Sequence, residues 1–281
     1  MKTIGIIGAG TMGLGIAQVF LQAGWTVKMY DIFSDVVETG RQKIEKSLAR
    51  LVEKGKCEQF DMDAMLQRLI VEKGLDAFSD CALVLEATPE EMGLKNALFK
   101  ELSGIMGEDC IMASNTSSLS ITQIAASAAK PERVVGLHFF NPAPVMELVE
   151  VVRGMRTSEE TMQEVLAIVC EIQKKPVVVA DSPGFIVNRA LVPMINEAAA
   201  MFAEGVADAE SIDLAMKLGC NHPIGPLALA DMIGLDIIQH VMETLQAEFG
   251  EDKYRVHPVI RKMVRAGTLG RKTKVGFYTY V

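Results

Sequence analysis

The chain has 281 residues, of which 49% are hydrophobic and 23% are charged, and its formal net charge is −8. A chain of this length can bury a substantial core in one large domain or two ordinary ones, and the composition is that of a globular protein and not a disordered one. The negative charge argues against a general nucleic-acid binder, because phosphate contacts need a basic surface. It is still compatible with an anionic small ligand that binds a local basic patch.

The five cysteines, at positions 57, 81, 110, 170 and 220, are odd in number and include no C-x-x-C pair. This pattern is typical of reduced thiols in a cytosolic protein, and we expect neither a disulfide framework nor a metal site. The apolar run in the opening residues MKTIGIIGAG is too short and glycine-rich for a signal peptide, and no later segment is long enough to span a bilayer. We therefore expect a soluble, cytoplasmic protein with no membrane partner.

The first two-thirds of the chain alternate short β-branched runs with helical patterns, which is typical of an α/β fold with a mostly parallel sheet. Strands are predicted at residues 3–7, 26–30, 82–86, 110–113, 133–139 and 176–180. Helices are predicted near residues 12–23, 35–54, 61–71, 91–105 and 158–172.

The character of the chain changes after Asp181. The segment SPGFIVNR opens a long helical pattern rich in Ala and Met, and further helical patterns follow at residues 208–218, 226–249 and 257–266. Proline and glycine residues separate these patterns, and no strand is predicted among them. The sequence predicts an α/β domain over residues 1–181 and an all-helical domain over residues 182–281. The apolar faces of the helical domain predict a homodimer or a higher homo-oligomer.

A glycine-rich loop, GAGTMG, lies between the first predicted strand and the first predicted helix. Such a loop can be merely a tight turn, but here Gly8 permits the turn, Gly10 lets a pyrophosphate approach the backbone, and Gly13 allows close packing of helix on strand. Asp31 ends the second strand about 20 residues later, where an acid binds the ribose 2′-hydroxyl and repels a 2′-phosphate. The pattern predicts a Rossmann-type domain that binds NAD and not NADP. The residues expected at the cofactor are Gly8, Gly10, Thr11, Met12, Gly13 and Asp31.

The helix predicted near residues 35–54 has a basic face. Four residues at positions i, i+3, i+7 and i+11 form what we call the basic stripe: Lys43, Lys46, Arg50 and Lys54. The stripe is either an ordinary solvated face or a binding surface for the phosphates of a polyanionic substrate tail. In the second case Arg50 and Lys54 are the strongest candidates. The sequence favours neither alternative.

Three further segments place polar groups at the ends of predicted elements. ASNTSSL, residues 113–119, follows one strand, and HFFNP, residues 138–142, follows the next apolar run. In open α/β folds ligands bind at the carboxyl ends of strands, which is where these two segments are expected. The third segment, SPGFIVNR, begins where the second domain would close over a cleft. By itself, His138 is compatible with a satisfied core histidine as well as with a catalytic base.

Together these segments resemble the L-3-hydroxyacyl-CoA dehydrogenase family, most closely its short bacterial members that act on 3-hydroxybutyryl-CoA. The resemblance runs nearly from end to end, through the motifs GAGTMGLGIA, SNTSSL, HFFNPAPVMELVE, DSPGFIVNR, GPLALADMIGLD and GFY. It implies NAD-dependent interconversion of a (S)-3-hydroxyacyl-CoA and a 3-ketoacyl-CoA. It also implies that the first domain binds NAD, and that the helical domain binds the substrate and forms the dimer.

The resemblance also implies roles for individual residues. By position, His138 matches the general base of the family, Glu150 its carboxylate partner, Ser117 the contact to the substrate hydroxyl, and Asn188 the amide beside the substrate. The positions that match at the cofactor, besides the glycine loop and Asp31, are Glu90, Lys95, Ser117, Asn141 and Lys272. Family members often have Asn where this chain has Glu91, and this extra acid puts the cofactor contact of Glu90 in question.

The proposed chemistry explains why a histidine and a glutamate are needed. Removing the 3-hydroxyl proton while hydride leaves C3 needs a base that titrates near neutrality, as imidazole does. A carboxylate behind the ring fixes its tautomer and stabilises the imidazolium. A tight hairpin at NPAP would place Glu147 opposite His138, but Glu150 lies within the apolar run LVEVV, where a buried carboxylate needs a partner. We predict Glu150, and therefore a connection that is not a tight hairpin.

Three alternatives remain. A β-hydroxyacid dehydrogenase of the 6-phosphogluconate or hydroxyisobutyrate type shares the start of the chain, but it uses a lysine where this chain has Gly184, four residues before Asn188. A dehydrogenase of a non-CoA 3-hydroxy acid on the same scaffold would not need the basic stripe. A non-catalytic NAD-binding protein would leave the presence of His138, Glu150 and Ser117 together unexplained.

Overall fold

The computed structural model describes residues 2–281 and divides into two compact units, which meet between Ser182 and Pro183. Each unit has its own hydrophobic core. The division lies one residue beyond the boundary that the sequence predicts after Asp181. Within residues 2–281, no helix combines the length and the apolar character needed to cross a membrane.

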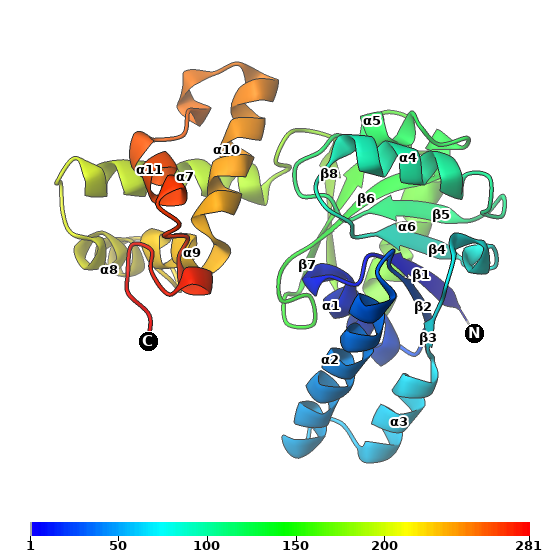
Figure 1. Ribbon diagram of the computed structural model, residues 1–281. Helices are drawn as coiled ribbons and strands as arrows, with labels where there is room; N and C mark the ends of the chain where they lie inside the picture. The colour runs from blue at the N-terminus through cyan, green and yellow to red at the C-terminus, as the bar shows by residue number, and fades with distance from the viewer. Residues whose placement is uncertain (1) are drawn as a thin grey trace. The chain divides into compact units, whose positions relative to one another are not determined.

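A single eight-stranded sheet forms the centre of the first unit (Figure 1). Its strands are β1 (Thr3–Ile7), β2 (Thr26–Tyr30), β3 (Leu69–Val71), β4 (Leu83–Glu86), β5 (Ile111–Ser114), β6 (Val134–Phe139), β7 (Leu148–Arg153) and β8 (Lys175–Ala180). The order across the sheet is β3-β2-β1-β4-β5-β6-β7-β8, and all neighbours are parallel except β6 and β7. This confirms the predicted α/β fold with a mostly parallel sheet. The central strands β4, β5 and β6 are buried along their whole length, as expected for strands covered on both faces.

Helices cover the sheet of the first unit. They are α1 (Thr11–Gln22), α2 (Ser34–Glu53), α3 (Gln59–Gln67), α4 (Met92–Leu102), α5 (Ile121–Ala125) and α6 (Glu159–Glu171), with short 3-10 turns at Leu75–Phe78 and Pro131–Arg133. Apolar side chains of α1 and α6 share one core with the strands. Helices α4 and α5 lie together, and α5 packs against β6 (Figure 1). The central strands of the sheet are therefore buried, and the loops between elements lie at the ends of the strands.

The structure corrects the predicted elements at four places. The predicted strands do not include β7, which pairs with β6 and β8. The helix predicted near residues 61–71 ends at Gln67, because the apolar residues after it form β3 and pair with β2. The five-residue helix α5 was not predicted. The helical pattern at residues 226–249 is two helices, α9 (Pro226–Ile233) and α10 (Leu235–Phe249), separated by Gly234. Gly234 has a φ angle of 107°, a conformation that side chains other than hydrogen rarely allow.

The second unit is helical, as predicted. Besides α9 and α10 it contains α7 (Val187–Ala203), α8 (Ala209–Gly219) and α11 (Pro258–Arg265), with 3-10 turns at Asp252–Tyr254 and Arg271–Thr273. Helix α7 contacts α9, α10 and α11, and Figure 1 shows α7 as the long helix against which they are assembled. Apolar side chains from these helices form the second core.

Two buried aspartates fasten the C-terminal segment to this core. Asp213 accepts hydrogen bonds from the backbone N–H groups of Leu227 and Ala228 at 2.7 and 2.8 Å, and from the hydroxyl of Tyr278 at 2.8 Å. It therefore caps the start of α9 and holds the chain end at the same time. Asp231, which is 1% exposed, accepts the backbone N–H of Tyr278 at 2.9 Å. The GFY motif is part of the helical core for this reason.

We expect Asp213→Ala to lower the free energy of unfolding by about 3 kcal/mol, because it leaves buried donors without an acceptor at roughly 1–3 kcal/mol each. Urea denaturation followed by circular dichroism measures the change. Asp208→Ala is the matched control, since the carboxylate of Asp208 also accepts a backbone N–H at the start of a helix but lies exposed, at the N-cap of α8. Equal destabilisation by the two substitutions would contradict this account.

Candidate active site

The glycine loop between β1 and α1 is shaped by close backbone contacts. Gly8 has a φ angle of +103°, and a Cβ on it would lie 2.5 Å from the carbonyl oxygen of Ala87. A Cβ on Gly13 would lie 1.9 Å from the carbonyl oxygen of Gly8, so α1 can start this close to β1 only with glycine there. A Cβ on Gly10, in contrast, would meet no protein atom within 4 Å. The loop is therefore packed on two sides and open at Gly10.

The surroundings of this loop fit a dinucleotide. Among residues 2–281, no side chain caps the N-terminus of α1, so its first backbone N–H groups and its positive dipole end can receive a pyrophosphate. Asp31 follows β2, and its two carboxylate oxygens accept the N–H groups of Ala9 at 2.8 Å and Phe33 at 3.1 Å. These contacts hold the carboxylate beside the loop, where a ribose hydroxyl would bind. Thr11 is exposed and Met12 half-buried in the first turn of α1.

A buried histidine–glutamate pair lies on the two antiparallel strands of the sheet. His138 on β6 stands directly opposite Glu150 on β7, and His138 Nδ1 lies 2.7 Å from Glu150 Oε2. His138 is 5% exposed and Glu150 is 1% exposed. Glu147, the alternative partner, is instead exposed and forms an ion pair with Lys175 at 2.5 Å. The structure therefore pairs His138 with Glu150.

This pairing determines which ring nitrogen is available for chemistry. An ionised carboxylate only accepts hydrogen bonds, so Nδ1 of His138 carries the hydrogen that it donates to Glu150. Nε2 is then the unprotonated nitrogen of the neutral ring and is the atom that can take a proton. The ring of Phe140 lies at a centroid distance of 4.4 Å and flanks the imidazole.

The connection between β6 and β7 is a fixed loop of residues 140–147. Lys174 Nζ donates hydrogen bonds to the carbonyl oxygens of Ala143 and Met146, both at 2.8 Å. On its other side the loop lies close to α1, since a Cβ on Gly15 would lie 3.2 Å from the Cβ of Ala143. Asn141, predicted at the cofactor, is exposed in this loop. The NPAP corner therefore lies against α1.

The segment after β5, which contains Ser117, is gathered around one carboxylate oxygen. Glu90 Oε1 accepts from Thr116 Oγ1 at 2.6 Å, from Ser117 N at 2.8 Å and Oγ at 3.2 Å, and from Ser118 N at 3.1 Å and Oγ at 3.2 Å. Burial by itself raises the pKa of Glu90, but the charge of Lys95 and these hydrogen bonds outweigh it, so that the pKa is lowered. Glu90 therefore stabilises the segment at neutral pH, and this contribution is lost as the pH falls below the ordinary Glu range of about 4.3.

The same segment is tied to the strand that carries the histidine. Asn115 Oδ1 accepts the backbone N–H of Phe139 at 3.0 Å, and Phe139 directly follows His138. Because β5 and β6 are parallel neighbours, their carboxyl ends lie side by side. Ser117 and His138 are therefore held at the same edge of the sheet.

Lys95 has a different environment from the one that its predicted place at the cofactor implies. It is 1% exposed, and its ammonium lies 2.6 Å from Glu86 Oε1 and 3.6 Å from Glu90 Oε2. Because Lys95 is buried beneath Glu90, its ammonium does not face solvent, from where a ligand would reach it. Sequence reasoning missed Glu86, although an acid that ends the apolar strand LVLE is a visible signal.

Two further predicted residues belong to the second unit. Asn188 is half-buried at the second position of α7. Lys272 is exposed and pairs with both oxygens of Asp236, at 2.5 and 2.6 Å. The amide of Asn188 is a group of the kind expected beside the substrate, and the ammonium of Lys272 is one of the kind expected at the cofactor.

The basic stripe lies on α2 in the first unit, and all of its residues are exposed. The opposite face is apolar, with Ile44 and Leu48 buried in the core. In the part of the chain that the structure describes, no stripe residue forms an ion pair within 4.0 Å. Its charges are thus available to a ligand, which is compatible with both alternatives raised by the sequence.

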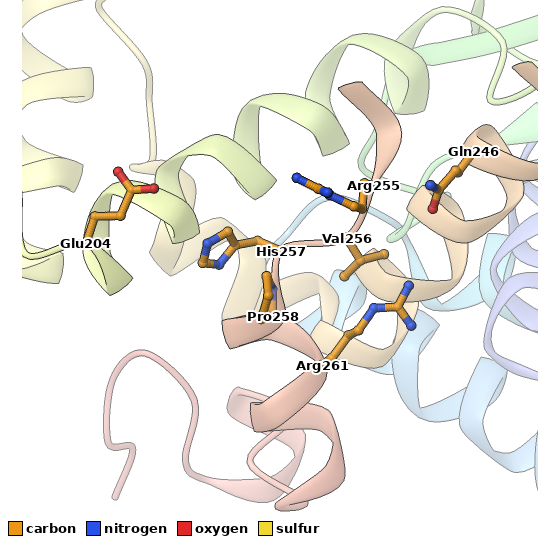
Figure 2. Close-up of a pocket in the computed structure, with 7 residues that line it drawn as sticks. All are labelled: Glu204, Gln246, Arg255, Val256, His257, Pro258 and Arg261. Atoms are coloured by element: carbon orange, nitrogen blue, oxygen red, sulfur yellow. The ribbon is translucent and has the colours of Figure 1, made fainter. Parts of the chain in front are cut away.

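A hollow of about 670 Å³ in the second unit contains none of the predicted residues. Figure 2 shows it, lined by Glu204, Gln246, Arg255, Val256, His257, Pro258 and Arg261. The imidazole of His257 caps α11 by accepting the N–H of Val259 at 3.3 Å, and Arg261 forms an ion pair with Glu243 at 2.6 Å. These side chains have structural partners, so we place the active site in the first unit, around His138.

Comparison with known proteins identifies the family. The model of the 3-hydroxyacyl-CoA dehydrogenase NAD binding domain matches residues 3–182, and the model of the 3-hydroxyacyl-CoA dehydrogenase C-terminal domain matches residues 184–280. The chain belongs to the 3-hydroxyacyl-CoA dehydrogenase family. It is therefore an NAD-dependent oxidoreductase, and residues 3–182 match the domain that binds NAD in this family.

Several relatives of this dehydrogenase match along most or nearly all of their length. The 3-hydroxybutyryl-CoA dehydrogenase of Clostridioides difficile is 48% identical, over 99% of both chains. The human mitochondrial hydroxyacyl-coenzyme A dehydrogenase is 39% identical, over 100% of this chain and 91% of its own. The crystal structure of (S)-3-hydroxybutyryl-CoA dehydrogenase PaaH1 from Ralstonia eutropha has a TM-score of 0.97 and 49% identity, and covers 100% of this chain and 99% of its own.

Two glycine substitutions in the dehydrogenase separate packing from cofactor binding. We expect Gly13→Ala to lower the melting temperature, because its methyl group overlaps the Gly8 carbonyl oxygen. Gly10→Ala meets no protein atom, so we expect an unchanged melting temperature but a Kd for NADH raised by at least about tenfold, or ~1.4 kcal/mol. NADH fluorescence titration and thermal denaturation measure both quantities. An unchanged Kd in Gly10→Ala would contradict the placement of the pyrophosphate.

Proposed function

We propose that this dehydrogenase interconverts (S)-3-hydroxyacyl-CoA and 3-ketoacyl-CoA, and that its substrates are short, with 3-hydroxybutyryl-CoA and acetoacetyl-CoA as the pair. The observation that carries the proposal is the 2.7 Å contact between His138 and Glu150. It lies at the same edge of the sheet as the glycine loop. The substrate class is supported by the names of relatives at 48% and 49% identity.

In this mechanism His138 moves the proton. Bound NAD supplies the acceptor for the hydride that leaves C3. Nε2 of His138 takes the proton of the 3-hydroxyl group as the C3–O bond becomes a carbonyl. Glu150 keeps Nδ1–H in place and stabilises the positive charge that develops on the ring, at low cost because the carboxylate is already oriented. In the reverse direction the protonated ring donates to the ketone oxygen.

Family resemblance assigns further polar side chains to the reactants. Ser117 contacts the substrate oxygen and the cofactor, and the amide of Asn188 lies beside the substrate. The remaining cofactor contacts are assigned by family resemblance to Glu90, Asn141 and Lys272. Lys95, which matches a cofactor position of the family, is buried and would act on the cofactor through Glu90. None of these residues needs to form a covalent bond, because the cofactor carries the redox chemistry.

The CoA moiety is assigned to the basic stripe. Arg50 and Lys54 lie exposed at the C-terminal end of α2, and neither forms an ion pair with another residue of the described part of the chain. A phosphate bound there would gain charge-assisted hydrogen bonds on an otherwise acidic protein. The alternative substrate, a 3-hydroxy acid without CoA, would make no use of these charges.

We further propose a cytoplasmic homodimer that serves fatty-acid and butanoate metabolism. Five free cysteines support a reducing compartment. The second unit exposes apolar side chains on and next to α8, with Leu214 exposed by 53%, Leu218 by 78% and Val206 by 66%. Apolar surface of this kind is typical of subunit interfaces.

We expect His138→Ala to lower kcat for acetoacetyl-CoA reduction by at least about 10²-fold, because the general acid–base is removed. NADH oxidation followed at 340 nm measures this, with the Kd for NADH expected to stay unchanged. His240→Ala is the control, since His240 is exposed on α10. A His138→Ala variant with near wild-type kcat would refute the mechanism, and a wild-type protein that binds NADH without turnover would refute the proposed activity.

Charge reversal tests the CoA assignment. We expect Arg50→Glu combined with Lys54→Glu to raise the KM for acetoacetyl-CoA at least about fivefold, since exposed ion pairs contribute up to roughly 1 kcal/mol each and become repulsive. The KM for acetoacetyl-N-acetylcysteamine, which lacks the nucleotide, should not change. Lys73→Glu combined with Lys100→Glu reverses two exposed charges elsewhere in the first unit and serves as the control. Equal effects on both thioesters would exclude the stripe as the CoA site.

A further inference from the structure

Glu86 is a buried carboxylate to which neither the family resemblance nor the proposed mechanism gives a role. It is the last residue of β4 and is 1% exposed. The sheet register places it between Ile7 at the end of β1 and Ser114 at the end of β5. It therefore lies between the strand that leads into the NAD loop and the strand that leads into the segment with Ser117.

Both oxygens of Glu86 are fully engaged. Oε1 lies 2.6 Å from Lys95 Nζ, from the backbone N–H of Thr88 and from the hydroxyl of Thr88. Oε2 accepts the hydroxyl of Ser114 at 2.6 Å. Ser114 in turn accepts the backbone N–H of Thr116 at 3.2 Å. Oε2 of Glu86 is thus linked through the hydroxyl group of Ser114 to Thr116, the residue before Ser117.

Oε1 of Glu86 is linked to the same segment through the ammonium of Lys95 and the carboxylate of Glu90. Lys95 Nζ, held by Glu86, lies 3.6 Å from Glu90 Oε2. Glu90 Oε1 then gathers Thr116, Ser117 and Ser118. The ammonium is bound more closely by Glu86 than by Glu90, which leaves the second carboxylate free to accept from the segment. Without the charge of Glu86, Lys95 would move toward Glu90 and compete with those donors.

Stability alone is a weak explanation for this arrangement. Taking charges out of water costs several kcal/mol for each ion, and well-packed apolar residues of similar volume are often as stable or more stable. Two carboxylates around one buried ammonium are better explained by the precision that their hydrogen bonds impose on the atoms they hold. Those atoms are the backbone and hydroxyl of Ser117.

We propose that Glu86 is a positioning residue of the active site, which fixes Ser117 both through Ser114 and through the Lys95–Glu90 pair. The proposal rests on the function proposed above, in which Ser117 contacts the substrate and the cofactor. Glu86 itself touches neither. Its effect on turnover passes through the Ser117 hydroxyl, and its effect on the segment exists whether or not the substrate is the proposed one.

A double-mutant cycle tests this pathway. In acetoacetyl-CoA reduction, Glu86→Gln should lower kcat/KM at least about tenfold when Ser117 is present and less than about twofold in the Ser117→Ala background, because coupled residues are not additive. Glu164→Gln is the matched control, since Glu164 pairs at 2.9 Å with the buried cation of Arg133 in the same unit. It should lower the melting temperature without changing kcat/KM. Equal losses from Glu86→Gln in both backgrounds, or no loss, would overturn the proposal.

Amide hydrogen exchange gives a readout that does not depend on activity. Glu86→Gln should accelerate exchange in peptides that cover residues 115–119, and Glu164→Gln should not. If the wild type has no turnover, the proposed function fails while this exchange pattern still decides whether Glu86 holds the segment. If Glu86→Gln does not fold, Thr88→Val removes one hydroxyl donor from Glu86 and leaves every charge in place. It should then show a smaller loss with the same dependence on Ser117, and equal losses in both backgrounds would again overturn the proposal.

Discussion

A carboxylate buried in the middle of a β-strand needs a partner, and Glu150 has one, His138, directly across the sheet. An unpaired charge at this depth would cost several kcal/mol, so the pair depends on the register of β6 and β7 as much as on the two side chains. That register needs the long connection of residues 140–147. Lys174 holds this connection by donating hydrogen bonds to the carbonyl oxygens of Ala143 and Met146. Lys174 therefore supports the position of the histidine without touching it.

The remaining polar groups of the first unit are arranged around that edge of the sheet. Asn115 ties the segment after β5 to β6, and Glu90 gathers the same segment by accepting its donors. The glycine loop follows β1, which β4 separates from β5 in the sheet, and this loop is open at Gly10. Three parallel strands thus end in an anion-binding loop, a hydroxyl group and an imidazole, which are the groups that a cofactor-linked oxidation of an alcohol requires.

Much of this could be predicted because buried strands are continuous apolar runs with turn residues at their ends. All six predicted strands lie within one residue of the observed bounds. The choice of Glu150 followed from burial, which the residues around it reveal. The three-residue strand β3 and the five-residue α5 carry too few residues to show a period, and tertiary pairing decides their structure. Lys95 shows the same limit, since a lysine is expected outside and only its two carboxylate neighbours explain its burial.

The central claim is that Glu150 acts on the chemical step through His138. Single-turnover reduction of acetoacetyl-CoA by Glu150→Gln, measured by stopped-flow absorbance of NADH, tests it most directly, because glutamine keeps the shape of the side chain and removes its charge. The account predicts hydride transfer slowed by at least about 10²-fold, with the Kd for NADH unchanged. A rate near that of the wild type in a folded variant would contradict it.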